Sequence, residues 1–284
     1  MAIAHADNFS IYGTGSAATA FMEDGVYAQA NGRPVTDPDG ISSGYVLSHL
    51  YGSGNTRIPW RYVLQDGAES TVGIALRTWF SPLPEESNKD RIMQWVDGSN
   101  NVLAYLYVTT TGALAMTITG GSTYTSTVPA ITAAGWYHIE AKYTHGSGAL
   151  CSFEVRVEGI AVAGLTQTDV TATDSDISQC SSWRDQISNT SNVYTKDLVI
   201  WTGSGSNNTD FLGSVLVTNL AITADVSLNW TPSTGSTGWE ILDNIPPVDT
   251  DYISADDTPP AAYVGTLSDL PAEVTRIVTG KRQQ

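Results

Sequence analysis

Carboxylates are the first residues to consider as catalytic groups, because glycoside hydrolysis needs two of them flanking one bond. On a strand, acidic residues at positions i and i+2 share a face and can aim at the same substrate. The chain offers three candidate pairs, and none has this arrangement: Glu85 with Glu86, Glu154 with Glu158, and Glu240 with Asp243. The second pair flanks Arg156, which is typical of a solvated row of charges. A glycoside hydrolase is therefore the least favoured function.

Histidine, serine and cysteine offer no better catalytic arrangement. The chain has four histidines: His5, His49, His138 and His145. None lies in the Gly-flanked turn that exposes a nucleophilic serine, and no cluster has the spacing of a zinc site. His138 alternates with Trp136 and Glu140, which is typical of the surface of a strand. We therefore predict no catalytic residues and no enzymatic activity.

Acidic pairs recur in the loops and offer oxygen ligands of the kind that calcium binds. The first of these pairs is Asp37 and Asp39, in the stretch "TDPDG". No loop has the carboxylate spacing of a known calcium hand, and Asx turns explain most such pairs. We expect no cofactor, and we keep calcium at Asp37 and Asp39 as the alternative.

The charge of the chain excludes several partners. Lys and Arg number 13 against 29 Asp and Glu, which gives a net charge of -16. A phosphate backbone or an anionic membrane surface would repel such a chain, so we predict no nucleic acid partner and no membrane insertion. No apolar run reaches the ~18 residues of a membrane span. The start, "MAIAHADNFS", lacks the basic flank and apolar core of a signal peptide.

Period-two alternation predicts an all-β protein. Val72, Ile74, Leu76 and Phe80 share one face of "TVGIALRTWF", while Arg77 and Trp79 face the other way; "ALAMTIT" and "WYHIEAKY" alternate similarly. Gly-containing turns separate strands about every ten residues from Ser70 to Val162, and Gly120-Gly121 marks a hairpin. Regular short strands of this kind predict a jelly-roll sandwich of two antiparallel sheets.

The two cysteines fit this architecture without a disulfide. Cys151 shares a strand face with Phe153, Val155 and Val157, where a small buried thiol packs well. A disulfide with Cys180 is the alternative, but we favour two free thiols.

The composition divides the chain at residue 222. Residues 1–222 contain the strand pattern and a loop-rich start, and residues 223–284 are rich in Pro, Gly, Ser, Thr and Asp. We read residues 223–284 as an extended C-terminal arm for attachment or oligomerisation. One short helix is predicted near residues 268–280, with Leu270 and Ile277 on its apolar face.

Three segments resemble a known group of proteins. The stretches "GWYHIEAKY", "CSFEVRVEGIAVAG" and "KDLVIWTGSGSNNTDFLGSVLVTNL" are similar to the concanavalin A-like, laminin-G-like sandwich, in the version found in phage and prophage virion proteins. The later segments Trp230–Ser233, Asp249–Ile253 and Leu267–Pro271 follow in the same order as in that group. The resemblance covers roughly residues 7–271.

The resemblance implies a non-enzymatic structural component of a phage particle, as a head decoration, head fibre or tail fibre protein. It implies a location in the virion, with assembly in the host cytoplasm. The protein partners it implies are capsid or tail proteins and further copies of the chain, with a trimer favoured. It also implies binding to host-surface polysaccharide. Its arm residues are Trp230, Tyr252, Leu270 and Ile277. The glycan contacts implied by the resemblance are Trp201, Asn207, Asn208 and Asp210, on the rim loop. This loop leads into a Val-rich strand.

Two alternatives stay open beside the structural role. A lectin-like module for host recognition would present exposed Trp or Tyr rings at the rim. A glycoside hydrolase would present two facing carboxylates in a groove.

Overall fold

The computed structural model describes residues 3–7, 9, 33–36, 45–49, 58–81, 83–84, 90–184, 192–204, 211–213, 217, 222–228, 231–232, 253–254 and 263–267. From residue 222 onward it describes the backbone alone. In these residues there is no helix, and thus no helix long and apolar enough to cross a membrane.

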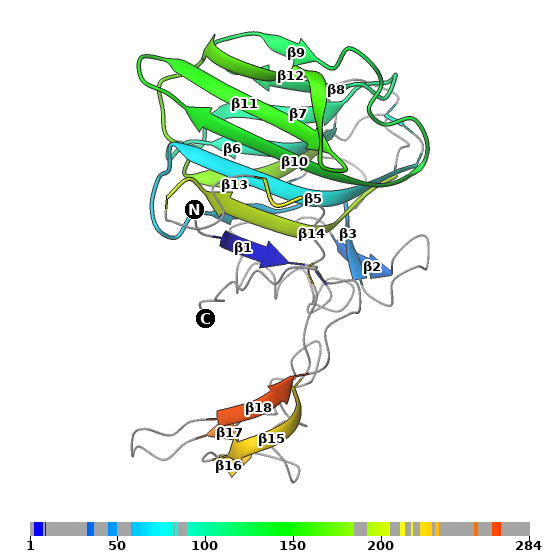
Figure 1. Ribbon diagram of the computed structural model, residues 1–284, viewed down its shortest axis with the longest axis vertical. Coiled ribbons are helices and arrows are strands. Elements are labelled where there is room, and N and C mark those ends of the chain that lie inside the picture. Colours follow the sequence, from blue (N-terminus) through cyan, green and yellow to red (C-terminus); the bar gives the residue numbers. More distant parts are fainter. Residues whose placement is uncertain are drawn as a thin grey trace.

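Two antiparallel sheets stack face to face and hold most of the described strands (Figure 1). Sheet A has the order β12-β11-β10-β5-β14-β3-β2, and β1 also pairs with β14. Its strands are β1 (Ile3–Asp7), β2 (Arg33–Thr36), β3 (Tyr45–Ser48), β5 (Thr71–Ser81), β10 (Gly135–His145), β11 (Leu150–Val157), β12 (Ile160–Thr171) and β14 (Asn192–Thr202). Sheet B has the order β4-β13-β6-β7-β8-β9. Its strands are β4 (Arg61–Val63), β6 (Asp90–Val96), β7 (Val102–Val108), β8 (Leu114–Ile118), β9 (Thr123–Thr125) and β13 (Gln179–Arg184).

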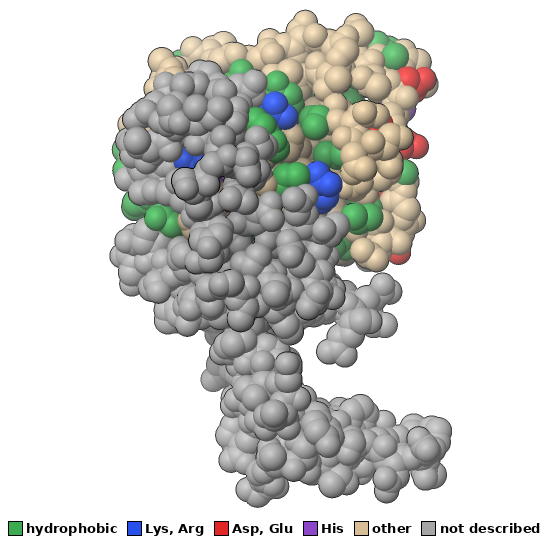
Figure 2. Space-filling view, turned by 180° about the vertical axis from the view of Figure 1, so that it is seen from behind, with side chains coloured by type: hydrophobic (Ala, Val, Ile, Leu, Met, Phe, Trp, Pro, Cys, Tyr) green, Lys and Arg blue, Asp and Glu red, His purple; other side chains and the backbone are tan. Residues whose placement is uncertain are grey.

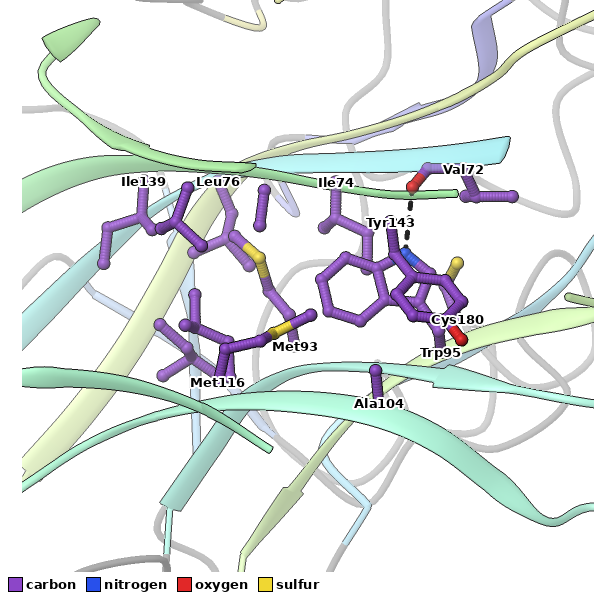
Figure 3. Packing of buried hydrophobic residues seen from close by; sticks show 14 of the residues in the cluster. Val72, Ile74, Leu76, Met93, Trp95, Ala104, Met116, Ile139, Tyr143 and Cys180 are labelled. Atoms are coloured by element: carbon purple, nitrogen blue, oxygen red, sulfur yellow. Dashed lines mark hydrogen bonds between the residues drawn. The ribbon is translucent and has the colours of Figure 1, made fainter. Parts of the chain in front are cut away.

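The predicted all-β sandwich is confirmed, and the alternating residues form its core. Val72, Ile74 and Leu76 of β5 are fully buried against residues of sheet B such as Met93 and Met116 (Figure 3). Because alternate side chains of a strand point to opposite faces, these positions leave Arg77 and Trp79 on the outer face. The core therefore decides which side chains sheet A presents outward.

Trp95 links the two sheets at the centre of this core. Its indole comes from β6 of sheet B, and Nε1 donates a hydrogen bond to the carbonyl oxygen of Val72 in sheet A, 3.0 Å away. The ring of Tyr143, from β10, lies 6.0 Å from the Trp95 ring (Figure 3). A buried indole N–H thus finds its acceptor across the sandwich, which fixes how the sheets face each other.

The hairpin predicted at Gly120-Gly121 forms between β8 and β9, although its loop has four residues, 119–122, instead of two. Gly121 N donates to Ile118 O, and Gly120 has a φ of 79°, which favours glycine.

The prediction of two free thiols is confirmed. Cys151 and Cys180 are both buried and unpaired with each other. Burial raises the pKa of both thiols, so both remain protonated and behave as small apolar side chains.

The C-terminal part contains two small antiparallel pairs, which Figure 1 draws away from the large sheets. One pairs β15 (Ile222–Leu228) with β18 (Tyr263–Leu267), and the other pairs β16 (Thr231–Pro232) with β17 (Ile253–Ser254). β15 begins at Ile222, so the predicted boundary falls one residue inside a strand. The predicted helix near 268–280 lies outside the described residues, and the division into sandwich and arm stays a prediction.

Candidate functional site

The outer face of sheet A gathers basic and aromatic side chains from three adjacent strands, β10, β5 and β14 (Figure 1). Arg77 of β5 lies directly opposite His138 on one side and Lys196 on the other. Trp79 of the same strand lies opposite Trp136 and Tyr194 in the same way. Directly opposed residues have Cβ atoms about 5 Å apart. We call these six residues the cationic–aromatic patch: Arg77, Trp79, Trp136, His138, Tyr194 and Lys196.

The aromatic half of the patch is held by edge-on and cation–π contacts. The rings of Trp79 and Trp136 meet at an angle of 62° with centroids 5.9 Å apart. The Lys196 ammonium lies 4.1 Å from the Trp136 ring centroid, within the range of a cation–π contact. Trp79, Trp136 and Tyr194 are all half-buried. They therefore keep part of each ring exposed while their positions are fixed by neighbours.

The basic half of the patch has the chemistry for binding carboxylates. The Arg77 side chain is 29% exposed, and its Nε lies 3.5 Å from Oδ2 of Asp197, a carboxylate that is almost fully buried. Lys196 is half-buried beside it. An Arg fork and a Lys ammonium on neighbouring strands form a site for an anionic group. Flanking aromatic rings add surfaces on which sugar rings can stack.

His138 lies in the same row but is fully buried. Its backbone N–H donates to Oε1 of Glu158 over 2.7 Å. Desolvation, together with the positive charge of Arg77, lowers the pKa of the imidazole to about 4, although the Glu158 carboxylate works in the opposite direction. The imidazole is therefore neutral at pH 7 and adds no third positive charge to the row. We predicted that His138 lies on a strand surface; it is on the outer face, but other parts of the chain cover it.

A short segment covers another part of the outer face of sheet A. We call Phe211–Gly213 together with Val217 the covering segment. Phe211, Leu212 and Val217 pack on a small cluster of Ala75, Val199 and Trp201. The Phe211 ring also lies 3.9 Å from the guanidinium of Arg156. The Val-rich strand that we predicted after this stretch lies outside the described residues, apart from Val217, and stays a prediction.

Two buried carboxylates hold the covering segment. Oε1 of Glu140 accepts hydrogen bonds from the backbone N–H of Leu212 at 2.9 Å and of Gly213 at 3.2 Å. Oδ1 of Asp197 accepts from Val217 N at 3.1 Å. Glu140 therefore positions backbone, whereas Asp197 both positions backbone and pairs with Arg77 of the patch.

The acidic pairs considered for glycoside hydrolysis do not form a catalytic pair in the described residues. Glu154 accepts from Nε of Arg156 at 2.7 Å, and Glu158 accepts from the His138 backbone. Glu85, Glu86, Glu240 and Asp243 lie outside the described residues. Within the described ranges there is also no group of three or more His, Cys, Asp and Glu side chains that could hold a metal ion.

The site residues expected from the sequence fall mostly beyond the described ranges. The following lie outside the described residues, and their roles stay predictions: Asp37, Asp39, Asn207, Asn208, Asp210, Trp230, Tyr252, Leu270 and Ile277. Trp201 is described and fully buried. The Phe211 ring packs edge-on at 6.3 Å from it, so the indole is not exposed to a glycan.

The sequence analysis missed the cationic–aromatic patch as a site. Its signal was present, since Arg77, Trp79 and His138 occupy positions facing away from the apolar side of their strands. The missing information was that β10, β5 and β14 lie side by side in the sheet, although β5 ends at Ser81, β10 begins only at Gly135, and β14 begins only at Asn192.

Comparisons with known proteins show the fold. The structure of an endo-β-1,4-glucuronan lyase from the fungus Trichoderma reesei matches 70% of this chain and 95% of its own, with 12% identity and a TM-score of 0.50. The alginate lyase Aly36B matches with 12% identity, a TM-score of 0.45, and coverage of 70% and 97%. A carbohydrate esterase from the Shiga toxin-encoding bacteriophage phi24B matches with 16% identity, a TM-score of 0.40, and coverage of 62% and 88%. No protein family model and no curated protein matches the sequence.

These comparisons overturn the predicted function. We predicted a non-enzymatic structural component of a phage virion, and no matching family supports one. The matched structures are instead polysaccharide lyases, a sialidase and a carbohydrate esterase. The prediction was wrong because it rested on the order of short segments in a sandwich, and a fold does not by itself imply a function. The comparisons support a less specific statement: the chain is a β-sandwich whose structural neighbours are carbohydrate-related and include a phage-encoded protein.

Proposed function

We propose that this chain is an enzyme that processes an acidic polysaccharide on the outer face of sheet A. The observation that carries the proposal is the placement of Arg77 opposite Lys196, beside the aromatic row of Trp79, Trp136 and Tyr194. The fold shared with the glucuronan lyase supports the same class of activity.

The charge of the patch favours an acidic polymer over a neutral one. Each sugar of a polyuronate carries a carboxylate, and an Arg fork with a neighbouring Lys binds such a group strongly. The chain as a whole has a net charge of -16, so its general field repels a polyanion. A local basic row is therefore required to hold the polymer, and it also decides where the polymer lies.

The chemistry that suits this patch is elimination. A base removes the proton on the carbon next to the carboxyl group, the bond from the adjacent carbon to the linking oxygen breaks, and a carbon–carbon double bond forms. The departing oxygen takes up a proton. Arg77 and Lys196 stabilise the negative charge that develops on the carboxyl group during proton removal.

Tyr194 is the residue we assign to proton transfer. It is half-buried and two residues before Lys196 on the same face of β14. Its phenolate oxygen takes the proton from the sugar carbon, and the phenol formed in this way gives that proton to the departing oxygen. His138 is fully buried and lies opposite Arg77 in the sheet register as a neutral neighbour.

Product analysis tests the proposal. The purified chain is incubated with polyglucuronate, alginate or dextran, and the conjugated unsaturated uronate is followed by ultraviolet absorbance. We expect product from a polyuronate and none from dextran. Arg77→Ala and Tyr194→Phe should each lower kcat/KM by about a hundredfold or more. Lys196→Ala should lower kcat/KM as well. The matched change Lys142→Ala should not, because Lys142 lies against Phe211 of the covering segment.

Absence of product from both polyuronates would refute the proposal. New reducing ends without the unsaturated product would refute elimination and indicate hydrolysis. Equal losses in Lys196→Ala and Lys142→Ala would remove the patch from the mechanism.

We further propose that the enzyme is phage-encoded and acts on host-surface polysaccharide, on the resemblance of its segments to phage proteins. Self-association as a trimer, contacts with capsid or tail proteins and a location in the virion stay predictions. The mass of the purified chain in solution, measured by light scattering, tests the trimer.

A further inference from the structure

The outer face of sheet B carries a second arrangement of flat side chains. The guanidinium of Arg91, on β6, lies 4.0 Å from the ring centroid of Tyr105 on β7 and 4.2 Å from that of Trp183 on β13. A guanidinium in such a position stacks by cation–π attraction with both rings. Three adjacent strands thus build one stack, which we call the sheet B stack: Tyr105, Arg91 and Trp183.

Hydrogen bonds fix the stack in place. Nη1 of Arg91 donates to Oε1 of Gln94 over 3.1 Å, and Nε2 of Gln94 donates to Oγ of Ser181 over 3.3 Å. Gln94 and Ser181 are buried, while the three members of the stack are half-buried. Side chains held in this way lose little conformational entropy when a ligand binds, which favours binding.

Another aromatic ring extends the surface along β7. Tyr107 lies opposite Arg91 in the sheet register, and its ring centroid is 5.9 Å from that of Tyr105. Alternate residues of β7 face outward, so the two tyrosines stand in line along the strand. The rings and their hydroxyl groups provide stacking faces together with hydrogen-bonding groups, the combination that suits a sugar chain.

The charge of sheet B favours an anionic occupant. Apart from the buried Arg184, its six strands contain two arginines, Arg61 and Arg91, and one acidic residue, Asp90. The whole chain has the opposite balance, with 29 acidic and 13 basic residues. Figure 2 views the molecule from this side and shows basic and hydrophobic side chains together on the face, with acidic side chains at its edge.

We propose that the sheet B stack is a second binding surface for acidic polysaccharide, separate from the patch on sheet A. Aromatic rings bind the sugar faces, and the Arg91 guanidinium binds a carboxylate of the polymer. The surface retains a long chain on the protein and takes no part in the bond-breaking step. The choice of an acidic polymer rests on the proposed function, but binding at this surface does not require catalysis.

Affinity electrophoresis of the full chain tests the proposal. Native gels containing polyglucuronate, alginate or dextran compare the wild type with Arg91→Ala and Trp183→Ala. We expect polyuronate to retard the wild type, and each variant to bind about tenfold more weakly. Arg91→Lys keeps the positive charge but loses the flat guanidinium group, so it should also bind more weakly. Lys142→Ala removes the same charge elsewhere and should bind like the wild type. Turnover of short uronate oligosaccharides should be unchanged in all four variants.

Several results would overturn this proposal. One is that polyuronate retards Arg91→Ala and Trp183→Ala as much as the wild type, or that Lys142→Ala weakens binding as much as they do. Another is that Arg77→Ala alone abolishes the retardation. A third is that dextran retards the wild type as much as polyuronate does. A dimer in light scattering that Arg91→Ala converts to a monomer would assign the surface to a second copy instead. Retardation that depends on Arg91, in a chain that releases no product, would refute the proposed function and leave this inference standing.

Discussion

The carboxylate of Glu140 accepts the backbone N–H of Leu212 over 2.9 Å and so joins the middle of β10 to a segment 72 residues later in the chain. The same oxygen accepts from Gly213, and the side chain is fully buried. A charge buried on the outer face of a sheet is stable because backbone donors replace water around it. The covering segment is therefore a fixed part of the sandwich, and it lies beside the cationic–aromatic patch on the outer face of sheet A.

Replacing Glu140 should loosen the covering segment. Glu140→Leu leaves two backbone donors without their acceptor, and we expect a loss of about 2 kcal/mol in the free energy of unfolding. Glu140→Gln keeps an acceptor oxygen and should lose less. Urea unfolding measures both variants. Equal losses for Gln and Leu would show that the hydrogen bonds contribute nothing.

Gly73 should not tolerate a side chain, because Trp201 lies over it. A Cβ at this position would collide with the indole of Trp201. We expect Gly73→Ala to lower the free energy of unfolding by about 1–3 kcal/mol, the usual range for overpacking. It should also speed proteolysis near Phe211, because the displaced indole no longer supports the covering segment. Gly135→Ala is the control, because a Cβ there meets no atom closer than 4.0 Å. Wild-type cleavage in Gly73→Ala would contradict the argument.

Trp95 should be needed for the stability of the sandwich. Trp95→Phe removes the hydrogen bond to the Val72 carbonyl and leaves a cavity between the sheets, so we expect a loss of about 3 kcal/mol. Trp183→Phe, on the outer face of sheet B, should lose less than about 1 kcal/mol. Guanidinium unfolding curves compare them, and similar midpoints for the two variants would be evidence against Trp95 as the link.

Two buried histidines should make stability fall in mild acid. The pKa of His49 is lowered to about 3 by burial and then by the charge of Arg184, and the pKa of His138 is lowered to about 4. Between the ordinary value of 6.5 and these values the unfolded chain binds more protons than the folded one. Stability is therefore fully present above pH 6.5 and decreases as the pH falls toward 4.

Unfolding free energies measured across this pH window check the prediction. His49→Gln and His138→Gln should each make the decrease less steep. His145→Gln is the matched control, since His145 is bound by Asp174 and Asp176 at the surface. A slope unchanged in both buried-site variants would show that other groups cause the acid sensitivity.

Much of the fold could be predicted from the sequence, because alternation is a local property. The apolar positions of β5, β8 and β10 predicted which side chains enter the core, and the buried residues agree. The outward direction of Arg77 and Trp79 followed from the same pattern. The free thiols also followed, since Cys151 shares its face with residues of the core.

The candidate site could not be predicted in the same way, because it depends on which strands are neighbours. Arg77, His138 and Lys196 come from strands far apart in the chain, and sheet order alone places them in one row. The burial of Trp201 depends on Phe211 folding back over sheet A, a long-range contact without a local signal. The sequence by itself determined which face of each strand is apolar, whereas the tertiary structure decided which outward residues meet, because non-local pairing and covering set their surroundings.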